Sequence, residues 1–312
     1  MSDSSGELFF LAGVTASGKT ELAITWAQEN DAEILSCDSV AFYKGMDIGS
    51  SKPSLDDQNK VCHYGLDLSP VNECFDISRF VEYARDVVSQ VHASGKKLLV
   101  VGGSGFYLHS FFEPVIDDVS VKPEIRMEVE ALRLQGIDQM MDRLRLLNPD
   151  GLGNLDLFNP MRVAKALERC MSSGKSLLEL NREFASLPKP YAEVRKSVLW
   201  LDREKDIMED RIMRRTLQMI EMGFLEEVNS LIQGGIEENP TARKAVGYRE
   251  VIAHLKGEID KDEMIKQINL STTRLAAKQR KWFRNHLPEG SRLLLSEEKP
   301  VSSVRMNWIS DS

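Results

Sequence analysis

The chain has 312 residues, of which 42% are hydrophobic and 28% charged, as in an ordinary globular protein with one large domain or two smaller ones. Its net charge of −8 excludes a protein coated in basic surface, and its four cysteines lack the C-x-x-C spacing of a zinc site or redox motif. The apolar runs are too short to cross a bilayer and the N-terminus does not resemble a secretory signal, so we expect a cytoplasmic protein that does not contact membranes.

Residues 8–23 predict a phosphate-binding loop between a strand, "LFFLA", and a helix, "TELAITWAQ". The intervening motif has the form G-x-x-x-x-G-K-[ST], in which backbone N–H groups and the helix N-terminus surround a phosphate. Lys19 adds a positive charge, and the Thr20 hydroxyl is the expected ligand of a Mg²⁺ cofactor. The residues assigned to phosphate binding are Gly13, Val14, Thr15, Ala16, Ser17, Gly18, Lys19 and Thr20. The motif does not identify the molecule that carries the phosphate.

The next hundred residues alternate between strands and helices. "AEILSCDS" and "KKLLVVGGSG" are predicted strands, and "ISRFVEYARDVVSQVHASG" is a predicted helix between them. Strands separated by helices indicate right-handed crossovers and a parallel sheet, and therefore an α/β fold. Ligands of such sheets bind beyond the carboxyl ends of the strands. We expect one crevice to collect the phosphate-binding loop, Asp38 with Ser39, and the glycine-rich residues 102–105.

The second half of the chain is predominantly helical in its pattern. From about residue 115 to residue 196 it predicts helices with polar connections, and "EKDIMEDRIMRRTLQMIEMGFLEEVNSLIQGG" predicts a long amphipathic helix interrupted near Gly223. We divide the chain into a first core segment (1–114), a helical insertion (115–198), a segment that completes the core and carries a basic C-terminal helix (199–290), and a polar tail (291–312).

The predicted helix "TRLAAKQRKWFR", residues 273–284, has an unbalanced charge. It carries five basic side chains and no acidic one, and at about 100° per residue the five fall within half of its circumference. Such a face either binds phosphates of a nucleic acid or is an ordinary solvated surface. The five basic residues are Arg274, Lys278, Arg280, Lys281 and Arg284.

Several of these segments resemble those of the tRNA dimethylallyltransferases, also named tRNA isopentenyltransferases or the IPP transferase family. "GVTASGKT" is similar to the family's "GPTASGKT". Six further blocks follow in the family's order: "DSVAFYKGMDIGSSKP", "GGSGFYL", "RVAKALE", "EDRIMRRTLQMIEMGF", "AVGYREVIAHLKGE" and "AKQRKWFR". The resemblance implies a core like that of the P-loop NTPases with a helical insertion domain.

The resemblance also implies an activity. A prenyltransferase of this family transfers a dimethylallyl group from dimethylallyl diphosphate to N6 of the adenosine 3′-adjacent to the anticodon in tRNA, and it releases diphosphate. The expected partners are therefore dimethylallyl diphosphate and a tRNA anticodon stem-loop, bound by a monomer. The phosphate-binding loop would then hold the diphosphate of an isoprenoid.

By the same resemblance, four residues are assigned to catalysis. Asp38 is the predicted general base for the N6 amine, although an aspartate at a strand end also suits a Mg²⁺ ligand. Arg215 matches the family's diphosphate-binding arginine, with an ion pair on its own helix as the alternative. Thr15 matches a hydroxyl near the diphosphate, and Ser104 stands where the family usually has threonine.

The resemblance assigns further residues to tRNA binding, because an adenine in a loop must leave its stack and enter a pocket before it reacts. Alanine at position 41 departs from the frequent glutamine, which removes any amide contact made there. In the insertion, Arg162, Lys165 and Arg169 lie at i, i+3 and i+7 on one helix face. The assigned residues are Asp38, Ser39, Val40, Ala41, Ser104, Arg126, Met161, Arg162, Lys165, Arg243, Lys244, Gly247, Tyr248, Arg249, Lys278, Gln279, Arg280 and Arg284.

Other functions fit parts of the pattern. An adenylate isopentenyltransferase or a small-molecule kinase would share the phosphate-binding loop and Asp38, but neither needs a helical insertion together with a basic helix. A non-enzymatic RNA-binding module has no reason to combine Lys19, Thr20 and Asp38. Salt-sensitive binding of tRNA distinguishes the kinase and the adenylate isopentenyltransferase from the tRNA-modifying enzyme.

Overall fold

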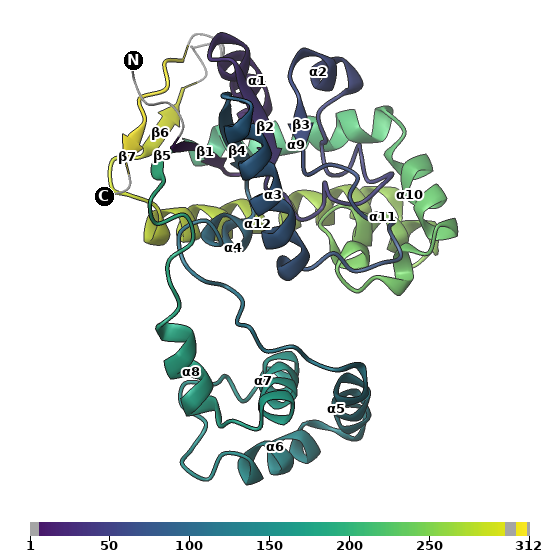
Figure 1. Cartoon of the computed structure of the whole chain (residues 1–312). Helices are drawn as coiled ribbons and strands as arrows, with labels where there is room; N and C mark the ends of the chain where they lie inside the picture. The colour runs from purple at the N-terminus through teal and green to yellow at the C-terminus, as the bar shows by residue number, and fades with distance from the viewer. Residues whose placement is uncertain (1–5, 297–303, 311–312) are drawn as a thin grey trace. The chain divides into compact units, whose positions relative to one another are not determined.

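The computed structural model describes residues 6–296 and 304–310, which fold into two compact units (Figure 1). The first unit combines Met1–Phe112 with Tyr191–Ser312, and the second is Glu113–Pro190. The insertion, predicted to end at residue 198, ends earlier: the second unit closes at Pro190, and Arg195–Arg203 form a strand of the first unit's sheet.

The first unit is built on a mainly parallel sheet, which confirms the predicted α/β class. In the described residues the strand order is β3-β2-β4-β1-β5-β6, and β7 pairs with β5 as the antiparallel exception. The strands are β1 (Glu7–Gly13), β2 (Ala32–Ser36), β3 (His63–Tyr64), β4 (Lys97–Gly102), β5 (Arg195–Arg203), β6 (Arg292–Leu295) and β7 (Ile309–Ser310). The carboxyl ends of β1, β2 and β4, which are neighbours in the sheet, therefore meet at one edge.

Helices cover both faces of the sheet, so its central strands are apolar on both sides. In β1, Leu8 and Phe10 belong to one core cluster, and Phe9 and Leu11 to the other. The second cluster contains the buried side of α1 (Lys19–Glu29). The first cluster contains side chains of α3 (Ile77–Ala93), α4 (Gly105–His109), α9 (Lys205–Glu221), α10 (Phe224–Gln233), α11 (Tyr248–Leu255) and α12 (Lys261–His286). None of the helices in the described ranges is long and apolar enough to cross a membrane.

Residues 291–312 were expected to be a polar tail, but the described ones, 291–296 and 304–310, contribute to the sheet and its core. β6 supplies parallel partners to the last residues of β5, and β7 pairs with Ser197 and Val198. The ring of Trp308 lies 5.2 Å from each of the rings of Phe9 and Trp26. β5 is buried along nearly its whole length, and β1 pairs with only one of its edges. Buried backbone N–H and C=O groups on the other edge also need hydrogen-bonding partners, and the short run "RLLL" supplies them.

The second unit is a small helical bundle with its own core. A buried asparagine, Asn148, joins two of its helices: its Nδ2 donates to Leu144 O at 2.8 Å, and its Oδ1 accepts from Leu177 N at 2.6 Å. Val129, Leu144 and Leu167 are among the buried core residues. The helices are α5 (Pro123–Gln135), α6 (Ile137–Leu146), α7 (Pro160–Ser173) and α8 (Leu177–Ala185), in agreement with the predicted helical insertion.

Candidate active site

The phosphate-binding loop connects β1 to α1, as its motif predicts. Gly13 is the last residue of β1 and Lys19 is the first of α1. Gly18 has a φ of 99°, in the left-handed region that favours glycine, so the loop can turn tightly into the helix. The first N–H groups of an α-helix lack partners within the helix and carry its partial positive charge. The loop therefore presents an anion-binding helix terminus at the carboxyl edge of the sheet.

Two arginines outside the motif hold the loop in this conformation. Arg211 Nε donates to Ala16 O at 2.8 Å, and Arg203 Nε donates to Ser17 O at 3.1 Å. Arg211 comes from α9 and Arg203 from the end of β5. Because these donors satisfy carbonyl oxygens of the loop, its shape depends on contacts far away in the sequence.

Lys19 extends a positive charge into a partly buried place. Its Nζ donates to Val14 O at 3.0 Å. Burial lowers the pKa of Lys19 to about 8, the nearby Asp38 opposes this shift, and Arg215 adds to it. Burial disfavours the charged form of Lys19 in the free protein, and a bound anion would stabilise this buried ammonium more than an exposed one. Lys19 is therefore suited to hold a phosphate group.

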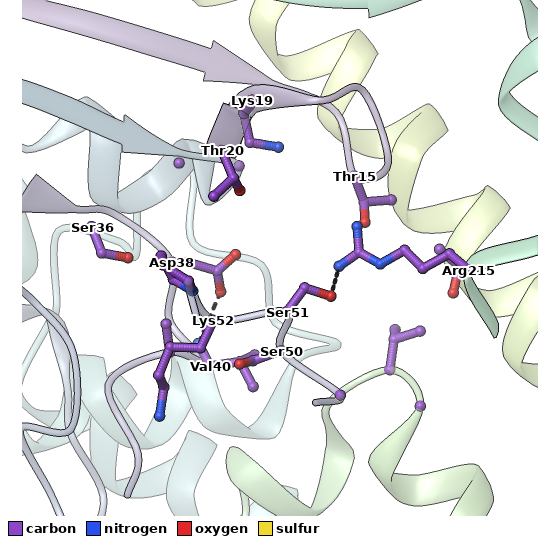
Figure 2. Close-up of a pocket in the computed structure, with 18 of the residues that line it drawn as sticks. Thr15, Lys19, Thr20, Ser36, Asp38, Val40, Ser50, Ser51, Lys52 and Arg215 are labelled. Atoms are coloured by element: carbon purple, nitrogen blue, oxygen red, sulfur yellow. Dashed lines mark hydrogen bonds between the residues drawn. The ribbon is translucent and has the colours of Figure 1, made fainter. Parts of the chain in front are cut away.

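Residues from different parts of the chain meet at one cavity (Figure 2). Its lining includes Thr15, Lys19 and Thr20 from the first loop and helix, Asp38 from the end of β2, and Arg215 from α9. Figure 2 shows Lys19, Asp38 and Arg215 extending into the same space. The predicted crevice at the strand ends is therefore present, and α9 and α12 form its other walls.

Asp38 lies directly beyond β2, on the turn that opens the block "DSVAFYKGMDIG". Its Oδ1 accepts from Val40 N at 3.0 Å, a contact that fixes the direction of the carboxylate. The side chain is partly buried and lines the cavity together with Lys19 and Arg215. A carboxylate in this place can accept a proton from an amine that enters the cavity.

Arg215 is held by a hydrogen bond from its Nη2 to Ser51 Oγ. Burial lowers the pKa of Arg215, and the charge of Asp38 counteracts this effect. The contact with Ser51 replaces the alternative expected from sequence, an ion pair with an acid on its own helix. A guanidinium fixed beside the phosphate-binding loop is suited to a diphosphate, which accepts several N–H donors.

The loop that carries Ser51 is anchored by a carboxylate from α10. The two oxygens of Glu227 accept from the backbone N–H groups of Asp47, Ile48 and Gly49 at 3.1, 2.6 and 3.2 Å. The Tyr248 hydroxyl donates to Glu227 at 2.8 Å and accepts from Ser50 N at 3.1 Å. Tyr248 is fully buried, so its predicted direct contact with tRNA does not agree with its position.

Ser104 and Ser39 connect two of the strand-end loops. Ser39 N donates to Ser104 Oγ at 3.3 Å, so the hydroxyl predicted to act in catalysis also fixes the turn after Asp38. Neither serine is among the cavity-lining residues, whereas the neighbouring Gly102 and Gly103 are. Among the other residues assigned to tRNA, the cavity lining includes Val40, Ala41, Gly247 and Gln279.

The remaining basic residues assigned to tRNA in the first unit differ in their surroundings. Arg280 is ion-paired with the fully buried Asp202 at 2.8 Å, and Arg249 with Glu250 at 2.7 Å. Both cations therefore have partners within the protein. Exposed side chains are found at Arg243, Lys244, Lys278 and Arg284.

The assigned residues of the second unit are exposed. Arg126 lies on α5, and the other three belong to the first turns of α7. Lys165 Nζ is 2.8 Å from Glu168 Oε2, and Arg162 Nη1 is 3.4 Å from Asp156 Oδ2. Met161 is 57% exposed, which is unusual for an apolar side chain at the start of a helix with a buried core face.

The described residues contain no group of three or more His, Cys, Asp or Glu side chains that would hold a metal on its own. Thr20, the predicted ligand, is exposed at the start of α1 beside the cavity. Mg²⁺ commonly takes few protein ligands and completes its shell with phosphate oxygens and water. The residues present therefore fit a metal that arrives with a diphosphate.

Sequence reasoning missed the residues that hold the site together. The block "GMDIGSSKP" was recognised, but no roles were assigned to Ser51 or Lys52. Lys52 has a side chain that is only 3% exposed, and it bonds Asp47 at 2.5 Å and Asp67 at 2.7 Å in the cavity wall. Glu227 lies in the segment that predicts an amphipathic helix, and nothing in that pattern indicates its partners. For Ser51 and Lys52, the only signal is their position inside the block "DSVAFYKGMDIGSSKP".

Comparisons with known proteins agree on one family. The model of the family described as IPP transferase matches residues 41–286. The chain is 46% identical over 283 residues to the tRNA dimethylallyltransferase of Opitutus terrae, an alignment that covers 91% of each chain. It is 31% identical over 281 residues to the tRNA dimethylallyltransferase of Halalkalibacterium halodurans, covering 89% of this chain and 88% of the other.

Solved structures give the same result. The full-length tRNA isopentenylpyrophosphate transferase from Bacillus halodurans is similar with a TM-score of 0.66 and 28% identity, covering 93% of this chain and 89% of that one. A eukaryotic dimethylallyltransferase acting on tRNA shares the fold, with a TM-score of 0.77 over 93% of this chain and 73% of that one, at 23% identity. The chain therefore belongs to the IPP transferase family.

Proposed function

We propose that this protein transfers a dimethylallyl group from dimethylallyl diphosphate to N6 of the adenosine 3′-adjacent to the anticodon in tRNA. The observation that carries the proposal is the meeting of Lys19, Asp38 and Arg215 at one cavity. This set combines cations for a leaving diphosphate with a carboxylate for an attacking amine. A relative that is 46% identical over 283 residues bears the name of the same activity, which supports the choice of substrate.

In the first half of the reaction, the protein holds the leaving group. The helix N-terminus after Gly18, the Lys19 ammonium and the Arg215 guanidinium bind the diphosphate oxygens, and Thr20 is the protein ligand of Mg²⁺. When bound, Mg²⁺ supplies further positive charge to the diphosphate. As the bond between the allylic carbon and oxygen breaks, negative charge grows on the diphosphate, and these fixed donors stabilise it.

In the second half, Asp38 acts on the nucleophile. The exocyclic amine of adenine is weak because its lone pair is delocalised into the ring. A carboxylate within hydrogen-bonding distance orients N6 and accepts its proton as the new bond to carbon forms. The contact of Asp38 with Val40 N holds the carboxylate in a constant direction for this task.

The RNA must deliver a single base to this cavity. An adenine of the anticodon loop leaves its stack and enters the pocket, as bases do in other nucleic-acid-modifying enzymes. The exposed basic side chains of α12, Lys278 and Arg284 among them, are positioned on the surface to contact phosphates. The monomeric state and the cytoplasmic location are predictions from sequence.

The test is transfer of labelled dimethylallyl diphosphate, with Mg²⁺, to two acceptors in parallel. One is an anticodon stem-loop with adenosine 3′ to the anticodon, and the other is AMP. We expect label in the stem-loop alone, and a matched stem-loop with guanosine at that position should stay unlabelled. Label in AMP alone would instead assign the protein to the adenylate isopentenyltransferases, and label in neither acceptor would refute the proposal.

A further inference from the structure

Three strand-end loops carry three of the four predicted catalytic residues, and hydrogen bonds connect these loops in a row. The loop after β2 carries Asp38, the loop after β4 carries Ser104, and the loop after β1 carries Thr15. Ser104 Oγ accepts from Ser39 N, which joins the first two loops. Backbone hydrogen bonds continue only a residue past the strands, from Cys37 N to Val101 O and from Val14 N to Leu201 O, so side-chain contacts contribute to the spacing of the loops farther out.

The second connection comes from α12, through Gln279. Its Oε1 accepts from Thr15 N at 2.9 Å, and its Nε2 donates to Gly103 O at 3.0 Å. Thr15 and Gly103 lie in the loops after β1 and β4, at 264 and 176 positions from Gln279 in the sequence. One primary amide therefore connects the phosphate-binding loop to the loop that carries Ser104.

The chemistry of the contact requires an amide of this length. The partner in one loop is an N–H donor and the partner in the other is a carbonyl acceptor, so the connecting group must accept on one side and donate on the other. A glutamate cannot donate to Gly103 O, a methionine can do neither, and an asparagine is one methylene shorter. The two partners also determine the orientation of the amide: its oxygen must face Thr15 N and its nitrogen must face Gly103 O.

Gly103 leaves room for this contact. A Cβ atom at position 103 would lie 2.6 Å from Gln279 Nε2, closer than such atoms approach one another. Any larger residue there would displace the amide from both partners. The glycine in "GGSG" and the glutamine in "AKQRKWFR" are therefore parts of one contact, although 176 positions separate them.

We propose that Gln279 is a positioning residue, which fixes the phosphate-binding loop against the loop after β4 and thereby places Thr15 for the diphosphate. This inference rests on the proposed function. It replaces the direct tRNA contact that the family resemblance assigned to Gln279. The amide is turned to the backbone of two loops, whereas the exposed Lys278 next to it faces solvent.

The test compares Gln279→Met and Gly103→Ala with the control Asn285→Ala, which removes an exposed amide from the same helix. Affinity for dimethylallyl diphosphate is measured without RNA, and affinity for the anticodon stem-loop is measured separately. We expect Gln279→Met to weaken diphosphate binding about tenfold, the scale of losing two hydrogen bonds, and to leave stem-loop binding within about twofold. Gly103→Ala should have the same pattern, and the double variant should be little worse than either single one.

The outcomes separate the inference from the function on which it rests. If Gln279→Met weakens stem-loop binding and leaves diphosphate binding unchanged, Gln279 contacts RNA and the inference is wrong. Independent, additive effects of the two substitutions would also contradict a shared contact. If the unmodified protein fails to bind dimethylallyl diphosphate, the proposed function fails instead. Thermal melting of all variants identifies any that do not fold. If Gln279→Met does not fold, the uncharged Gln279→Asn replaces it: its amide is one methylene too short to reach both partners, so diphosphate binding should weaken several-fold and stem-loop binding should not change.

Discussion

The cavity and the exposed face of α12 are both rich in positive charge, but the two regions hold that charge differently. In and beside the cavity, Lys19, Arg211 and Arg215 each donate a hydrogen bond to another residue of the first unit. Among residues 273–284 of α12, four exposed cations form no ion pair within the described part of the chain. These are Arg274, Lys278, Lys281 and Arg284.

The difference indicates two modes of anion binding. Cations that are fixed in a partly buried site need no reorganisation when the ligand arrives, and they act at low dielectric. Cations on flexible exposed side chains attract phosphates over longer distances, and salt screens them. We therefore expect single substitutions in the cavity to have large effects on catalysis or diphosphate binding. Substitutions of the exposed cations of α12 should have smaller effects, confined to RNA.

The largest effect is expected for Asp38→Asn, which keeps the shape and the contact with Val40 N but removes the base. Transfer to the stem-loop should fall about 10²- to 10⁴-fold, the usual contribution of a positioned general base. Both substrates should still bind, because the amide keeps the volume of the carboxylate and the contact with Val40 N. Single-turnover kinetics and separate binding assays check this. An undiminished rate would remove Asp38 from the mechanism.

Lys19→Met tests whether a fixed cation dominates diphosphate binding. We expect the Kd for dimethylallyl diphosphate to rise about 10- to 100-fold, the scale of a hydrogen bond to a charged group. The stem-loop affinity should not change, since Lys19 is part of the phosphate-binding loop and not of the exposed face. Titration calorimetry of each ligand alone measures both. If Lys19→Met lowered the affinity for both ligands equally, the cavity and the exposed face of α12 would not differ in the anions they bind.

The lowered pKa of Lys19 predicts a dependence on pH. In the free protein Lys19 loses its proton as the pH rises through about 8, whereas a bound diphosphate keeps it charged. Binding therefore takes up a proton at higher pH, and the Kd for dimethylallyl diphosphate should rise up to about tenfold per pH unit above 8. Lys19→Arg, which stays charged, should give a flat profile between pH 8 and pH 9.5. A similar rise in that variant would place the titrating group elsewhere.

Sequence patterns predict those parts of the molecule whose residues are consecutive in the chain. The strand, turn glycines and helix of the phosphate-binding loop are consecutive, so residues 8–23 predict both the structure and an anion site. Asp38 could be placed because it follows a buried strand, and parallel strands end at one edge of a sheet. The roles assigned to Asp38 and Lys19 are still predictions.

The parts that sequence reasoning missed depend on partners far apart in the chain. Glu227 is hydrogen-bonded to Ile48, 179 positions away, and no periodic pattern of its helix indicates a partner. Arg280 belongs to the predicted basic face of α12 but is paired with the buried Asp202, 78 positions earlier. The last strands were missed because β6 has only four residues, too few to show a period.

The exposed face of α12 can be tested with Lys278→Gln and Lys281→Gln together. We expect a several-fold weaker stem-loop complex, and the slope of log K against log[salt] should fall by about one for each phosphate that the protein no longer neutralises. The Kd for dimethylallyl diphosphate should not change. The control is Arg280→Gln on the same helix, because Arg280 is already paired with Asp202. This variant should show the same dependence of log K on log[salt] as the unmodified protein. An unchanged slope in the double variant would show that this face does not bind phosphates and is an ordinary solvated surface.

The smallest effect concerns α7, where the predicted basic face is neutralised by pairing. Lys165 is bound to Glu168, so Glu168→Gln should release its ammonium and make α7 resemble α12. Because the Lys165 side chain is 64% exposed and water screens its pair with the buried Glu168, the pair is worth about 1 kcal/mol or less, and stem-loop affinity should improve only about two- to threefold. Glu128→Gln removes the same charge from an exposed position on α5 and serves as the matched control. If both variants change the affinity equally, the net charge of the second unit matters and the pairing of Lys165 does not.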